Sequence, residues 1–240
     1  MPIDNPITKR EGCALKNEIQ SFEPVENRVP PYWPPYWFCN CYVVGSTAGA
    51  PMRLIWVTDI HLNFVNEDGA NAFAQAIRNQ APQVLLVGGD IAEAHDVEHW
   101  LRWLVKAVEV PVYFVLGNHD YYRGSIAGVR ETVRALCSVV DGLTWLSEQG
   151  PISLTEQTAL IGHGCWGDGR LGDFLRSSVM LNDYVLIREL SGSIPMQRLE
   201  QLHRLGDEAA AHLRTSLEAA LKSHQHVLAL THVPPFREAC

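Results

Sequence analysis

The chain has 240 residues, of which 47% are hydrophobic and 19% are charged, and its formal net charge is −8. This composition is typical of a globular domain with one sizeable core. The negative charge argues against broad attraction to nucleic acid or anionic membranes. The six cysteines include no C-x-x-C pair, which favours reduced thiols over a disulfide framework or a zinc ribbon. No apolar run approaches the ~20 residues of a membrane helix, and no secretion signal begins the chain, so we expect a cytoplasmic protein.

Residues 1–51 differ in texture from the rest of the chain. They show no helical or strand period, and residues 30–37 are rich in proline and aromatic residues, so we expect this segment to be extended or disordered. One interpretation is a proline-rich ligand for an aromatic groove. The other is an over-extended reading frame, because Met52 directly precedes the first apolar run. We therefore place the domain at residues 52–240.

From residue 52 onward, short apolar runs alternate with amphipathic stretches, as a β-α-β chain requires. The first expected elements are strands 54–58, 84–88 and 112–116 and crossover helices 68–79 and 96–108. Crossovers of this length make the three strands parallel.

The second half of the domain continues this alternation. It predicts a helix at 125–139, a meander on another sheet at 152–154 and 158–161, a long helix at 195–223 that bends at Gly206, and a last strand at 227–231.

Metal-ligand side chains follow four of the expected strands. In parallel α/β sheets, ligands bind beyond the carboxyl ends of the strands, so these residues are read together: Asp59, His61, Asp90, Asn118, His119, Asp120 and His232. A single strand-end Asp or His has ordinary explanations, such as a helix cap. Four strand ends with the same pattern, and two carboxylates that would repel each other without a cation, indicate a metal site. Carboxylate, amide and imidazole donors suit Mn, Fe or Zn.

The motifs Asp59-Ile60-His61, Gly89-Asp90, Gly117-Asn118-His119-Asp120 and the later His232 resemble those of the calcineurin-like metallophosphoesterase family. The resemblance covers residues 52–240 and implies an α/β fold, a four-layer α-β-β-α sandwich of two mixed sheets. It also implies that Asp59 and His61 hold a first metal, that Asp90 bridges, and that Asn118 and His232 hold a second. His119 would meet the phosphate and leaving group, with Asp120 orienting its ring.

The expected reaction is hydrolysis of a phosphomonoester or phosphodiester in a small phosphorylated substrate. Two cations about 3.5 to 4 Å apart lower the pKa of a shared water and supply hydroxide at neutral pH. Two alternatives remain open at this stage. One is a nucleotide or nucleotide-sugar pyrophosphatase, and the other is an inactive binding or regulatory module with the same fold.

The family pattern also contains a later Gly-His-x-His element that supplies one ligand to each metal, and this sequence has none. We therefore expect a truncated reading frame, in which fewer protein ligands weaken metal affinity.

Substrate-binding candidates come from a glycine-rich segment and from the residues after the third motif. Residues 162–167 match G-x-G-x-x-G, but a turn-rich stretch follows where a nucleotide-binding helix should begin. We interpret this segment as a loop near the site, or as an ordinary surface loop. Its candidates, together with an arginine that could clamp a phosphate or lie on the surface, are Arg123, His163, Trp166, Asp168 and Arg170.

Overall fold

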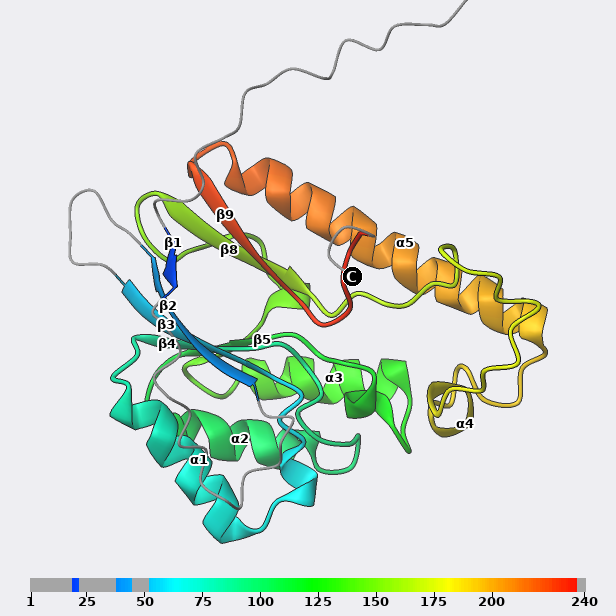
Figure 1. Ribbon diagram of the computed structural model, residues 1–240, viewed down its shortest axis with the longest axis horizontal. Coiled ribbons are helices and arrows are strands. Elements are labelled where there is room, and N and C mark those ends of the chain that lie inside the picture. The colour runs from blue at the N-terminus through cyan, green and yellow to red at the C-terminus, as the bar shows by residue number, and fades with distance from the viewer. Residues whose placement is uncertain (1–18, 22–37, 45–51, 237–240) are drawn as a thin grey trace, which may run out of the picture.

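Two β-sheets face each other, and helices cover the outer face of each (Figure 1). The computed structural model describes residues 19–21, 38–44 and 52–236. The larger sheet has the order β1-β2-β3-β4-β5-β6 and the smaller one the order β7-β8-β9. The strands are β1 (Ile19–Ser21), β2 (Phe38–Val44), β3 (Met52–Thr58), β4 (Val84–Val87), β5 (Val112–Phe114), β6 (Leu143–Trp145), β7 (Ile152–Ser153), β8 (Thr158–His163) and β9 (His226–Thr231).

The helices confirm the expected crossovers, with ends that differ by a residue or two for most of them. They are α1 (Glu67–Asn79), α2 (Val97–Val108), α3 (Ile126–Cys137), the single-turn α4 (Asp183–Leu186) and α5 (Pro195–Ala220). Strands β3, β4, β5 and β6 pair in parallel. In the smaller sheet, β8 pairs antiparallel with β7 and parallel with β9. Both sheets are therefore mixed, as expected.

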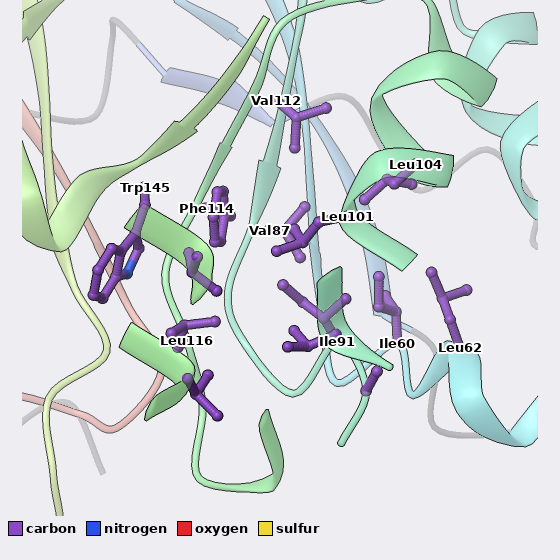
Figure 2. Close-up of a cluster of buried hydrophobic side chains, with 14 of the residues drawn as sticks. Ile60, Leu62, Val87, Ile91, Leu101, Leu104, Val112, Phe114, Leu116 and Trp145 are labelled. Atoms are coloured by element: carbon purple, nitrogen blue, oxygen red, sulfur yellow. The ribbon is translucent and has the colours of Figure 1, made fainter. Parts of the chain in front are cut away.

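The alternation of side chains along each strand divides the core into layers. In β4, Leu85 and Val87 face the helices, whereas Val84 and Leu86 face the smaller sheet. In β8, Leu160 joins the core between the sheets, and its neighbours pack toward α5. Figure 2 shows the helix side of this arrangement, where Val87 and Phe114 lie against Leu101 and Leu104 of α2. The four-layer α-β-β-α arrangement is thus confirmed.

The edge of the larger sheet extends beyond the expected domain start. Strand β2 pairs antiparallel with β3 along its whole length, from Phe38 opposite Thr58 to Val44 opposite Met52, and β1 pairs with β2. The backbone of 38–44 therefore belongs to the sheet, although residues 1–51 showed no strand period. The proline-rich run 30–37 lies outside the described residues.

Helix α5 runs uninterrupted through Gly206, where we expected a bend. A Cβ at Gly206 would lie 2.9 Å from Cβ of Asp168, so glycine allows a loop to pack closely against the helix. No helix in the described part of the chain has the length and apolar character needed to cross a membrane.

Candidate metal centre

The turns after β3 and β4 have unusual backbone conformations. Asp59, His61 and Asp90 have φ angles of 54°, 41° and 52°, and Gly89 has 96°. Non-glycine residues rarely occupy this region, at a cost of about 1 to 3 kcal/mol each. Backbone hydrogen bonds join the turns: Asp59 N–H donates to Gly89 O at 3.1 Å, His61 N–H to Asp90 O at 3.0 Å, and Leu62 N–H to Ile91 O at 2.8 Å. The fold thus holds both carboxylates at one edge of the sheet.

The turn after β5 approaches closely because it contains Gly117. A Cβ there would press against the Asp90 carboxylate and lie 2.6 Å from Asp90 N and 2.8 Å from Cε1 of His232. The next residues lie directly over this contact. His119 N–H donates to Oδ1 of Asp90 at 2.9 Å. Glycine therefore lets the third turn and the end of β9 converge on Asp90.

Two groups of potential metal ligands meet at Asp90. The first group consists of His61, Asp90 and His119, and the second of Asp59, Asp90 and His232; within each group, one ligand atom per residue lies within 4.8 Å of the others. The resemblance implied different pairs, Asp59 with His61 and Asn118 with His232. Asp90 is the shared member in both assignments.

Nε2 of His232 and Oδ1 of Asn118 face each other. Nδ1 of His232 lies 2.9 Å from Gly88 O and donates to it, which leaves Nε2 facing Oδ1 of Asn118 at 3.2 Å and Oδ1 of Asp90 at 3.4 Å. The Asn118 amide is oriented by Nδ2, which donates to the Asp183 carboxylate at 2.9 Å. Three acceptors this close repel unless a proton or a cation lies among them.

Burial changes the pKa values of the ionisable groups in this site. Burial raises the pKa of Asp90, and the carboxylates of Asp59 and Asp183 raise it further, while the His119 N–H opposes them. Burial lowers the pKa of both His61 and His119, which favours the neutral, metal-binding form of each ring. The donor set therefore fits divalent cations, which would compensate the buried carboxylates without a proton.

Asp120 has partners other than the expected one. It is fully buried; Oδ1 accepts from the N–H groups of Ile91 and Ala92 at 2.8 and 2.9 Å, and Oδ2 accepts from the N–H of Gly117 at 2.8 Å. These bonds use the carboxylate to join the second and third turns. The resemblance implied that Asp120 orients the ring of His119, but its hydrogen bonds go to backbone N–H groups instead. Asp120 therefore positions the second and third turns.

Two further residues lie beside the site, and of these Asp183 was missed in the sequence. Tyr122 stacks on His119 with ring centroids 4.2 Å apart, and its hydroxyl donates to Oδ1 of Asp183 at 2.7 Å. Asp183 lies 65 positions after Asn118, on the single turn α4, and no sequence pattern connects it to the motifs. Its two donors tie α4 to the third turn.

The five substrate-binding candidates have different surroundings. Trp166 lines a cavity of about 250 Å³ beside Asn118 and His232. Arg123 pairs with Glu93 at 2.9 Å.

The other three candidates lie outside that lining. His163 is buried and accepts from Cys165 N–H at 2.9 Å. Arg170 pairs with Asp168 at 2.7 Å and with Asp207 of α5 at 2.9 Å. These contacts hold the glycine-rich loop against the fold, and no helix starts at its end: residues 168–182 precede α4.

A comparison with protein families assigns the part of the chain that carries this site. The family model for calcineurin-like phosphoesterases matches residues 52–240, and the chain belongs to this family. The two groups of potential ligands around Asp90 lie within the residues that the family model matches.

A segment of 75 residues is 32% identical to the uncharacterized protein YpbG of Bacillus subtilis (strain 168). This match covers 30% of the chain and 27% of the length of YpbG.

Two solved structures match the chain at low sequence identity. One is the crystal structure of phosphopantetheinyl hydrolase (PptH) from Mycobacterium tuberculosis, with a TM-score of 0.54 and 17% identity over 78% of this chain and 70% of that one. The other is the crystal structure of TT1561 from Thermus thermophilus, with a TM-score of 0.49 and 13% identity over 77% of this chain and 69% of that one.

Proposed function

We propose that the chain hydrolyses a phosphomonoester or a phosphodiester with two divalent cations that share Asp90. The observation that supports this most strongly is that both groups of potential ligands contain Asp90. Asp59, His61, Asn118 and His232 would supply the other protein ligands. Bound Mn, Fe or Zn ions would supply hydroxide at neutral pH and offset the charge of the phosphoryl oxygens.

His119 is the candidate general acid of the reaction. Its ring is fixed between Tyr122, stacked at 4.2 Å, and the edge of His61 at 4.7 Å, and its side chain is 32% exposed. Burial lowers its pKa, so the free site favours a neutral ring. A bound phosphate anion would favour the imidazolium, which could protonate the departing oxygen.

The test is metal-dependent turnover of an activated ester. Protein stripped with a chelator is reconstituted with Mn²⁺, Fe²⁺ or Zn²⁺ and assayed with p-nitrophenyl phosphate and bis(p-nitrophenyl) phosphate. Asp90→Asn should lower kcat/KM by roughly a hundredfold or more, because both ions lose a ligand. Asp141→Asn, at an exposed turn, is the matched control and should leave activity unchanged.

Three results would count against the proposal. They are activity that survives chelation, an Asp90→Asn variant as active as the parent, and metal binding with no turnover of either ester. The last would favour the inactive binding module. The preference between the two esters reports which reaction the site serves.

A further inference from the structure

A cavity of about 250 Å³ opens beside the metal donors Asn118 and His232. Besides the turn after β5 and the end of β9, its walls come from the loop after β8, the region of α4 and the helix α5, which supply Trp166, Tyr184 and Leu202. The volume is somewhat below the ~300 Å³ lower end for pockets that hold drug-sized ligands. It suits one ring or a short chain.

The lining is apolar with one carboxylate. Leu181 and Val233 join the aromatic and leucine side chains, and Asp183 is the acidic member. The described lining includes neither lysine nor arginine. Burial raises the pKa of the lining thiol of Cys165 to about 11, so that group adds no charge near neutral pH. Away from the candidate metal donors, an anion in this cavity would meet the Asp183 carboxylate and no lysine or arginine of the lining.

The nearby arginines already have partners. Arg198 donates from Nε to Leu190 O at 3.0 Å and from Nη2 to Ser193 O at 3.1 Å. Arg123 and Arg170 pair with carboxylates, as described above. To bind a second phosphate of the substrate, any of these cations would first have to give up those bonds.

We infer that this cavity binds the uncharged, apolar part of the substrate, an aryl or short alkyl group whose phosphate lies at the metal donors. The inference rests on the proposed function and narrows it. The substrate class is a phosphoester of an apolar alcohol or phenol, not a nucleotide or nucleotide-sugar pyrophosphate. Trp166 provides a flat surface against which a ring would pack, whereas Tyr184 already has the Arg198 guanidinium over its ring, 4.5 Å from the centroid.

The test uses non-hydrolysable phosphonates, so that binding is measured without turnover. Calorimetric titration of the Mn²⁺-loaded protein compares methylphosphonate, phenylphosphonate and 4-phosphonobenzoate. Phenylphosphonate should bind about tenfold tighter than methylphosphonate or better, since a ring is removed from water. 4-Phosphonobenzoate carries a second anion away from the metals and should bind more weakly than phenylphosphonate.

Variants locate the effect in the cavity. Trp166→Ala should lower the ratio of phenyl to methyl affinity toward one and leave methylphosphonate binding intact, and Trp166→Phe should restore most of the ratio. Leu181→Asp, at a position 44% exposed, tests the same wall if Trp166→Ala does not fold, and should lower the ratio as well. Val139→Ala, on an exposed side chain beyond the end of α3, is the matched control.

The outcomes separate the two claims. No binding of methylphosphonate overturns the proposed function itself. Methylphosphonate binding with a phenyl to methyl ratio near one overturns the cavity assignment alone. Tighter binding of 4-phosphonobenzoate than of phenylphosphonate also overturns it, because an anion would then be favoured.

Discussion

The turns that carry the metal donors and the segment 164–194 that closes the cavity are built in opposite ways. The turns follow buried parallel strands and are joined by backbone hydrogen bonds around Asp90 and Asp120. The segment contains one turn of helix and leaves Leu171, Val179 and Met180 more than 60% exposed. The candidate chemical centre is thus fixed by backbone, whereas the cavity wall depends on a few long-range contacts.

These contacts include bonds from the N–H groups of Ile126 and Ala127 to the Glu189 carboxylate, at 2.9 and 3.0 Å. Asp183 accepts from Asn118 and Tyr122, Arg123 N–H donates to Leu186 O at 2.8 Å, and Arg188 N–H donates to Gly124 O at 3.0 Å. A substitution in the turns should therefore disturb metal binding most. One in the segment should act on metal binding through Asp183, or through Gly164, whose carbonyl accepts from the N–H of His232 at 3.3 Å.

The same substitution in each region gives the largest expected contrast. Gly117→Ala places a methyl group against the Asp90 carboxylate and the ring of His232, so cation affinity should fall by about 10- to 100-fold. Gly172→Ala has open space around its Cβ and should leave affinity unchanged. Mn²⁺ titration measures both. Equal affinities for the two variants would mean that the turns tolerate displacement and that the proposed rigidity is wrong.

Removal of Asp183 tests the link between the two regions. Asp183→Ala leaves the Asn118 amide and the Tyr122 hydroxyl without their shared acceptor, so cation affinity should fall by about tenfold. Asp173→Ala, an exposed carboxylate of the same segment, is the control. If cation affinity is the same in both variants, Asp183 positions the cavity wall and not the metal donor.

Most of the fold, and the convergence of the candidate metal donors at one edge of the sheet, could be predicted from the sequence because each rests on a local pattern with a general consequence. Runs such as 84–88 predict buried strands, and parallel strands bring their carboxyl ends to one edge. Strand β6 was missed because three residues, Leu143–Trp145, are too few to show a period. Strand β2 was also missed, because its place in the sheet depends on tertiary pairing with β3 and β1.

The surroundings of the site were harder to predict for the same reason. Asp120 is adjacent to His119 in sequence, but adjacency does not set the direction of a side chain, and its carboxylate turns toward backbone amides. Asp183 reaches Asn118 only because α4 folds back over the third turn. The roles of the metal donors stay predictions until metal binding is measured.

The effect of pH on cation binding tests whether a cation and a proton compete at Asp90. Burial raises the pKa of Asp90, so in cation-free protein the buried proton stabilises the fold at low pH, and that stabilisation is lost as pH rises through the raised pKa. A cation replaces the proton. The stabilisation by Mn²⁺ should therefore be larger at about pH 8 than at about pH 5, by roughly 1 kcal/mol in the free energy of unfolding. The increase in Tm caused by Mn²⁺ should be larger at the higher pH as well.

Thermal unfolding with and without Mn²⁺ at both pH values measures this difference. Asp90→Asn provides the control, since its side chain does not titrate and its cation response should be small at either pH. A Tm increase that is independent of pH in the parent protein would show that the cation does not compete with a proton at Asp90.

We expect the smallest effect on stability and activity from a substitution of Arg170, which the sequence analysis gave as a substrate-binding candidate. Its ion pairs with Asp168 and Asp207 lie at the surface, where such pairs contribute about 0 to 1 kcal/mol. Arg170→Met should therefore change thermal stability little and leave kcat/KM for aryl phosphates unchanged, whereas Trp166→Ala should lower it. A rise in KM for every phosphate ester in Arg170→Met would mean that the guanidinium leaves its carboxylates to bind phosphate, and that the segment supplies charge as well as an apolar wall.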